Sequence, residues 1–180
     1  MNQLNRELAL NLLGKDPTSW EFARYIEYNK ITIDDKLIAS LALQKDGLLL
    51  KFCSKELKND KEVVAIAVTK NGMALDYASE MLKDCDDIVK IAMKLNQAII
   101  FASPRIKKDK TFALISLQYN PNDIRFYSQE IRTICGQATN PSERMLQRRK
   151  LEKAIASEKI AQQLNNELSY KNDIKAKMKI

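Results

Sequence analysis

A set of columns that recurs about every 25 residues constrains the fold of this chain more than any other feature of its sequence. An asparagine or aspartate returns at steps of 25, 25 and 24 residues, at Asp46, Asn71, Asn96 and Asn120. A serine keeps the same step, at Ser54, Ser79, Ser103 and Ser128. An aliphatic residue followed by a base also keeps it, at Leu57-Lys58, Leu82-Lys83, Ile106-Lys107 and Ile131-Arg132. Several independent columns at one period indicate a structural repeat, whose copies must stack to bury their apolar faces.

The clearest copy covers residues 60–83 and is predicted to form two amphipathic helices joined by a tight turn at Asn71-Gly72. In its first half, four apolar residues at helical spacing share one face: Val63, Val64, Ala67 and Val68. In its second half, an apolar face is expected from Ala74, Ala78, Met81 and Leu82. The first helix should begin at a cap, either Asp60 or Asn59 in a capping box with Glu62, and Asn71 can cap the second helix. Each copy is thus expected to be an αα-hairpin.

A degraded copy opens the chain, because Asp16-Pro17 matches Asn120-Pro121 as a helix cap followed by proline at the first helical position. Terminal repeats are expected to be atypical, and Trp20 and Tyr25 are predicted to belong to the capping core of this copy. Pro104 would remove a hydrogen bond inside a helix, so the second helix of its copy is expected to break or restart there. We therefore expect a capping repeat over residues 1–33, four hairpins over 34–136, and a basic helix and tail over 137–180.

One column set resembles the repeat family called domain of unknown function 4116. The residues that carry the resemblance are Asp60, Val63, Val64, Ala67, Val68, Asn71, Gly72, Ala74, Leu75, Tyr77, Ala78 and Ser79. It extends, weakened, over roughly residues 34–132, and it departs from the pattern at Gln97 and Pro121, where the turn glycine would be. The resemblance implies a helical repeat that is common in proteins of intracellular bacteria and some protists, often within larger secreted factors. It implies no catalytic residues.

Composition supports an all-helical fold, since the four glycines all fall at expected turns or helix ends and no strand pattern is visible. No run of about eighteen apolar residues occurs, so no transmembrane helix is expected. The first residues lack the pattern of a standard signal peptide. Three widely spaced cysteines indicate reduced thiols. We expect a cytoplasmic protein in the producing cell, with translocation into a host cell without a cleavable signal peptide as the second option.

The net charge of +7 is concentrated in the C-terminal tail, where bases outnumber acids, whereas the repeats are nearly neutral. Asn140-Pro141 with Glu143 forms a helix-start signal, so a long helix is predicted from Pro141 to about Leu168. An apolar stripe is expected along one face, made of Ile160, Ala161, Leu164 and Leu168, with Leu146 in register. Leu151 and Ile155 point elsewhere, so the stripe is not that of a sustained coiled coil.

Three interpretations of the tail follow. Its first part packs on the last repeat while the rest is a solvated extension, or it binds a partner as an amphipathic helix, or it attaches to a membrane surface. The third is disfavoured because the apolar face is short and lacks Trp and Phe. The candidate partner-binding residues are Arg144, Arg148, Arg149, Lys150, Ile160, Leu164 and Leu168.

The sequence offers little support for catalysis. It contains no histidine, which excludes a Ser-His-Asp or Cys-His centre within this chain. No glycine-rich nucleotide motif occurs. Cys53 falls in a small-residue column and is expected to be a core residue, and Cys85 is expected at the surface. Asp84, Asp86 and Asp87 are interpreted as acids at a helix N-terminus rather than as a cation site.

We therefore predict an all-α protein of stacked antiparallel helical hairpins, an α-solenoid-like repeat with a long C-terminal helix. Its expected function is non-enzymatic protein–protein interaction, as a secreted bacterial effector or as a regulator of another protein. No catalytic, cofactor or metal residues are predicted. The alternative is a nucleic-acid-binding protein that uses the basic C-terminal helix, which predicts binding that weakens steeply with salt.

Overall fold

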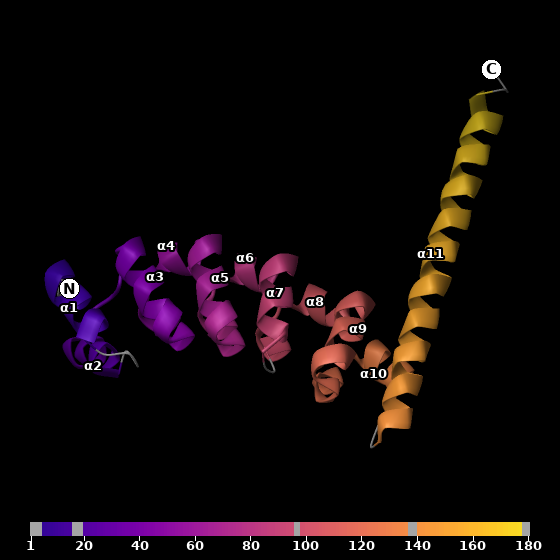
Figure 1. The fold of residues 1–180 in the computed structure, drawn as a ribbon. Coiled ribbons are helices and arrows are strands. Elements are labelled where there is room, and N and C mark those ends of the chain that lie inside the picture. The colour runs from indigo at the N-terminus through magenta and orange to yellow at the C-terminus, as the bar shows by residue number, and fades with distance from the viewer. Residues whose placement is uncertain (1–4, 16–19, 96–97, 137–139, 178–180) are drawn as a thin grey trace. The chain divides into compact units, whose positions relative to one another are not determined.

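The structure, a computed structural model, describes residues 5–15, 20–95, 98–136 and 140–177 of the 180-residue chain. The regular secondary structure of these residues consists of α-helices and 3-10 helices (Figure 1), with one isolated parallel bridge between Ile33 and Cys53. The predicted all-α hairpin fold with a long C-terminal helix is confirmed. Contacts divide the chain into two compact units, Met1–Lys107 (unit 1) and Lys108–Ile180 (unit 2). The three-part division expected from the repeat columns stays a prediction.

One copy of the repeat consists of a long α-helix, a 3-10 helix and a short α-helix. In the clearest copy these are α5 (Lys61–Lys70), η2 (Gly72–Tyr77) and α6 (Glu80–Lys83). The expectation of one continuous second helix is wrong, because the backbone is extended at Ala78 and Ser79. This break changes the helical phase, so Met81 is exposed rather than part of the apolar face.

The other copies have the same order of elements. They are α3 (Lys36–Lys45), η1 (Gly47–Phe52) and α4 (Lys55–Lys58); α7 (Asp86–Met93), η3 (Ala98–Phe101) and α8 (Pro104–Lys108); and α9 (Lys110–Tyr119), η4 (Pro121–Phe126) and α10 (Gln129–Cys135). Before them lie α1 (Arg6–Lys15) and α2 (Trp20–Asn29), and after them α11 (Pro141–Lys177). The expected turn positions Asn96 and Gln97 lie outside the described residues.

The serine column explains the break in each copy. The Ser79 hydroxyl oxygen accepts from the Leu82 N–H at 3.3 Å and caps α6, which requires non-helical backbone at the serine. Its own N–H leaves the copy and donates to the carbonyl of Lys58 at 2.9 Å. The corresponding N–H groups in unit 1 donate to the preceding copy in the same way, from Ser54 to Ile33 and from Ser103 to Lys83.

The second helix of the copy that begins with α7 restarts at Pro104, as expected, although the proline does not cause the break. The break at Ser103 precedes it, and α8 begins at Pro104, where the missing N–H has no helical partner to lose. The Ser103 hydroxyl caps α8 by accepting from the Ile106 N–H at 3.2 Å. Proline is thus compatible with this column because every copy restarts its helix there.

The core of unit 1 lies between the long helices and the 3-10 helices. The predicted residues Val63, Val64, Ala67 and Val68 are fully buried. The same columns are buried in α3 and α7, at Ile38, Ala39, Ala42, Leu43, Ile88, Val89, Ala92 and Met93. The glycine that opens η1 serves this packing, because a Cβ on Gly47 would lie 2.2 Å from the carbonyl oxygen of Ala67 in the next copy.

Helix caps follow the sequence with one correction. Asp60 caps α5 by accepting from the N–H groups of Glu62 and Val63 at 2.9 and 3.2 Å. Asn59 does not cap α5, so the predicted capping box of Asn59 and Glu62 is wrong. Asn59 ends α4, and its side chain accepts from the Ser79 hydroxyl at 2.6 Å. Asn71 caps η2 as expected, accepting from the Met73 N–H at 3.0 Å.

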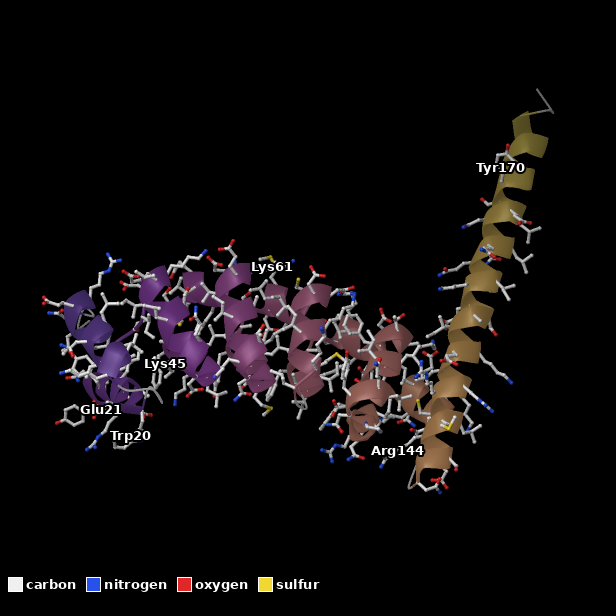
Figure 2. The ribbon with its side chains drawn as sticks, viewed as in Figure 1. Trp20, Glu21, Lys45, Lys61, Arg144 and Tyr170 are labelled. Atoms are coloured by element: carbon white, nitrogen blue, oxygen red, sulfur yellow. The ribbon has the colours of Figure 1, made fainter. Side chains whose placement is uncertain are left out.

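The N-terminal copy consists of two regular α-helices, whose buried residues are Ala9, Leu13, Phe22 and Ile26. Trp20 is 62% exposed, so its placement in the capping core is wrong. It precedes Phe22 by two residues, about 200° around the helix, and therefore faces away from the core (Figure 2). Tyr25 is half-buried. Asp16 and Pro17 lie outside the described residues.

In unit 2, α9, η4 and α10 form the last copy and α11 packs against α9 and α10. The Asn140 side chain caps α11 as predicted, accepting from the Glu143 N–H at 3.0 Å. The helix continues to Lys177, beyond the predicted end near Leu168. Among the residues that the structure describes, none of the helices combines the length and the apolar character that a bilayer-spanning segment needs.

Candidate functional site in the C-terminal helix

Up to residue 170, where its side chains are described, α11 is anchored to the rest of unit 2 through its first part alone. Leu151 is fully buried and Gln147 is nearly so, and Ala154 and Ile155 are half-buried. The Gln147 side-chain amide donates to the carbonyl of Gly136 at 2.8 Å. The buried face of α11 is therefore the one that carries Leu151, and not the one that carries the predicted stripe.

Lys110, the first residue of α9, fixes α11 at the end of this anchored part. Its side chain is only 11% exposed, and its Nζ lies 2.5 Å from Glu130 of α10 and 2.6 Å from Glu158 of α11. Hydrogen bonds to Glu130 and Glu158 raise the pKa of Lys110. One lysine thus joins three helices of unit 2.

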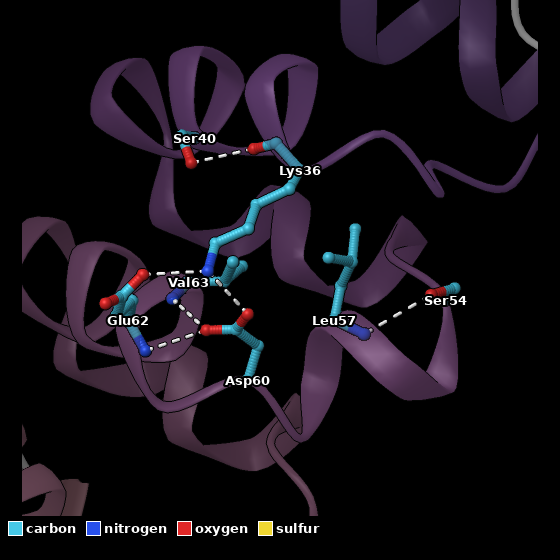
Figure 3. A network of polar contacts seen from close by, with 7 residues as sticks. All are labelled: Lys36, Ser40, Ser54, Leu57, Asp60, Glu62 and Val63. Atoms are coloured by element: carbon cyan, nitrogen blue, oxygen red, sulfur yellow. Dashed lines mark hydrogen bonds and ion pairs between the residues drawn. The ribbon is translucent and has the colours of Figure 1, made fainter.

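The same lysine position links neighbouring copies in unit 1. Figure 3 shows Lys36 of α3 between Asp60 and Glu62 of the next copy, at 2.8 and 2.7 Å. Lys61 of α5 pairs with Asp87 of α7 at 2.7 Å. Sequence reasoning missed this column. Its signal is a lysine directly after an aspartate cap, at Asp35-Lys36, Asp60-Lys61 and Asp109-Lys110.

Beyond Glu158, α11 presents the predicted stripe to solvent. Every residue from 156 to 170 is exposed, and Ile160, Leu164 and Leu168 are exposed by 57%, 54% and 58%. These three residues recur every four positions and therefore share one helix face. Figure 2 shows side chains around this part of α11 as far as Tyr170. Ile160, Leu164 and Leu168 thus form an aliphatic ridge that the described residues of unit 2 do not cover.

The basic candidate residues divide between two faces of α11. By the helical period, Lys150 lies five turns before Leu168, and Arg149 lies about three turns before Ile160, so both are near the stripe. Arg144 and Arg148 are on the opposite side, and Arg148 pairs with Glu152 at 2.9 Å. Lys153, which was not predicted, lies two turns before Ile160 and is exposed. The sequence prediction had grouped all four predicted bases into one site.

Two of the cysteines are buried, and the acids on either side of Cys85 are paired. Burial raises the pKa of the Cys53 thiol to about 12 and that of Cys135 to about 11, which disfavours the reactive thiolate. Arg105 pairs with Asp84 and Asp86 at 3.0 and 2.6 Å. No grouping of three or more histidine, cysteine, aspartate or glutamate side chains suited to a metal ion occurs within the described residues.

A buried polar cluster in unit 2 was not predicted. Asp123 is almost completely buried, and its carboxylate accepts from the Asn120 side chain at 3.0 Å. Burial raises the pKa of Asp123 to about 6. Nearby in the same copy, the hydroxyls of Ser116 and Tyr127 lie 2.7 Å apart. The cluster is internal, and it makes the last copy more polar than the copies of unit 1.

A second exposed cluster lies on α2. Trp20, Arg24 and Tyr28 recur every four residues on one face, and the Arg24 guanidinium lies 5.3 Å from the centre of the Trp20 ring. Trp20 and Tyr28 are both largely exposed. Because Glu21 and Glu27 belong to the same helix, its charge is mixed. The charge of this face does not point to one class of partner.

The repeat region of this chain matches a known protein family. The family model described as domain of unknown function (DUF4116) matches residues 35–83 and 85–132, together more than half of the chain. No curated protein and no solved structure matches. Each family match covers two copies of the repeat, and both end before α11. The family therefore accounts for the repeats and does not extend to the candidate residues.

Proposed function

We propose that this chain, which belongs to the repeat family of the domain of unknown function (DUF4116), is a non-enzymatic binding protein that recognises another protein through the exposed part of α11. In this proposal the repeats are the scaffold, and unit 2 holds the base of α11 through Leu151 and Lys110. The helix then presents its ridge to a partner. The cytoplasmic or translocated location of the protein stays a prediction.

The aliphatic ridge of Ile160, Leu164 and Leu168 carries the proposal. Complete burial of such a side chain contributes about 1.5–3 kcal/mol, so three of them can supply much of the free energy of an association. A polar helix with no neighbour is only marginally stable in water, and a partner along the ridge would stabilise it. Helix-to-helix docking by residues spaced four apart is a recurring mode of protein recognition.

Nucleic-acid binding through the same helix is the alternative. Two observations weaken it: Arg148 is paired with Glu152, and the aliphatic ridge has no role in contacts with phosphates. Glu158 and Glu167 also interrupt the positive charge of α11. The proposal of a protein partner uses both the ridge and the bases beside it.

The test is co-precipitation of partners by the full chain and by two variants, with and without nuclease. Leu164→Glu places a charge in the ridge, whereas Met145→Glu places one at an equally exposed position off the ridge and serves as the matched control. We expect Leu164→Glu to lose a nuclease-resistant protein partner and Met145→Glu to retain it. Recovery of nuclease-sensitive material alone, or equal binding by both variants, would contradict the proposal.

A further inference from the structure

We infer that the partner of α11 presents an amphipathic helix whose aliphatic stripe is flanked by acidic residues at the end that faces Lys150 and Lys153. This inference rests on the proposed function, and it adds the chemical class of the partner. It follows from the shape of the exposed ridge and from the order of charges along the same face of α11.

The ridge is narrow and short. Ile160 and Leu168 are eight residues apart, which is about 12 Å along a helix. Gln163 and Asn165 stand on the two sides of Leu164, so the ridge is a single row of residues spaced four apart. Such a row packs into the groove between the corresponding rows of another helix. A partner helix with its own aliphatic stripe matches this surface in width and in length.

Bases stand before the ridge. Lys153 and Lys150 precede it on or near its face and are exposed. Glu158 is held by Lys110, which leaves Glu167 as the acid beside the ridge within residues 156–170. The described face is therefore basic and then aliphatic, and the complementary helix is acidic where it faces Lys150 and Lys153.

A second copy of this chain does not provide that complement. In an antiparallel pair of α11 helices centred on Leu164, Glu167 of one copy faces position 161 of the other and does not reach Lys153. A parallel pair places Lys150 and Lys153 opposite the same lysines. Neither arrangement places an acid opposite these two bases, which disfavours self-association.

A membrane surface and a nucleic acid also fit less well. Membrane-surface helices bury a wide apolar face, commonly with Trp or Phe, whereas this ridge is one residue wide and aliphatic. A phosphate backbone would attract the lysines but would leave Ile160, Leu164 and Leu168 exposed. Only an acidic amphipathic helix uses both the lysines and the ridge.

The experiment is a selection from a displayed library of helical peptides. Each peptide carries aliphatic residues at every fourth position over two turns, with random residues at the flanks. The selection is run separately against four targets. They are the full chain, the double variant Lys150→Glu/Lys153→Glu, Leu164→Glu and the off-ridge control Met145→Glu. Selected peptides are then measured by fluorescence anisotropy at low and high salt. Sedimentation of the chain alone measures self-association. Binding of the chain to an RNA oligonucleotide and to anionic vesicles is measured for comparison with the peptides.

We expect the full chain and Met145→Glu to enrich peptides with Asp or Glu at the flanks, and Leu164→Glu to enrich none. The double lysine variant should weaken binding of an acid-flanked peptide about five- to tenfold at low salt. It should instead enrich peptides with a base at the flank that faces positions 150 and 153. High salt should reduce the difference between the two targets.

The outcomes separate this inference from the proposed function. The inference would be overturned if the selected peptides carried the aliphatic stripe without a preference for Asp or Glu at the flanks. It would also be overturned if the double lysine variant selected the same acidic flanks. Either result would leave protein binding through α11 in place. No enrichment at all would count against both. Self-association that Leu164→Glu abolishes would show that a second copy of the chain occupies the ridge and would overturn the inference. Stronger binding to RNA or to vesicles than to any peptide would overturn it in favour of that ligand.

Discussion

At the scale of single residues, the last copy differs from the others by polar side chains in its core. Asp123 is the third residue of η4, the position that Leu49 and Ala74 occupy in η1 and η2. Those residues are buried and apolar, whereas the Asp123 carboxyl is buried with a pKa raised to about 6. A carboxyl whose pKa is higher in the folded state favours folding when it is protonated.

Asp123 should therefore make unit 2 less stable as pH rises. Its contribution is favourable below the unfolded pKa near 3.8 and is lost as pH rises through about 6. We expect Asp123→Asn to have nearly the wild-type stability at acidic pH and to exceed it by about 2–3 kcal/mol at neutral pH. Urea denaturation at both pH values tests this, with the exposed Asp76→Asn as control. An advantage of Asp123→Asn that does not change with pH would contradict the assignment.

At the scale of elements, the copies are joined by a few close contacts that recur with the repeat. The serine N–H groups, the lysines after the caps and the turn glycine all act between one copy and the next. Such nearest-neighbour links determine the spacing of a repeat stack. Loss of one link should therefore affect the junction where it lies more than distant parts of the unit.

Gly47 provides a sharp test of the spacing between copies. Gly47→Ala would place a Cβ 2.2 Å from the Ala67 carbonyl oxygen, which the backbone can relieve only by moving α5 away from η1. We expect a loss of about 2–4 kcal/mol in the free energy of unfolding. Gly14→Ala, in α1 with open space around its Cβ position, should instead be neutral or stabilising by up to about 1 kcal/mol. Equal thermal denaturation midpoints for the two variants would argue against close packing at Gly47.

Lys110 should govern how firmly α11 is held. Lys110→Met keeps the length of the side chain but removes the charge that pairs with Glu130 and Glu158. We expect amides around Ala154 and Glu158 to exchange about tenfold faster, a loss of about 1.4 kcal/mol in local stability. Lys159→Met, at an exposed position of the same helix, is the control. Unchanged protection in Lys110→Met would mean that Leu151 and Gln147 hold the helix without the lysine.

At the scale of the whole molecule, stability and the proposed binding site are separate. The buried side chains belong to the repeats and to the first part of α11, whereas residues 156–170 are exposed. Residues 159–180 should thus be dispensable for folding and required for binding. The family matches cover the repeats and not α11, which agrees with this division.

A chain that ends at Glu158 should test this separation. It keeps Leu151 and the Glu158 pair with Lys110, so we expect its free energy of unfolding to fall by less than about 1 kcal/mol. It should nevertheless lose the partner. A chain that ends at Gly136 also loses the burial of Leu151, and it should be destabilised by about 3 kcal/mol or more. Strong destabilisation of the longer chain, measured by urea denaturation, would place the distal helix in the core.

The sequence by itself determined the repeat, the buried faces of the long helices, the Asp60 and Asn71 caps and the start of α11, because these depend on spacing and on contacts within a few residues. Only the tertiary structure decided where each second helix breaks, because the N–H of Ser79 finds its partner in the neighbouring copy. It also decided which face of α11 is buried. Lys110 meets Glu158 48 residues later in the chain, and the surface of α9 and α10 selects Leu151 over the stripe. Spacing along one helix cannot specify a face that another helix chooses.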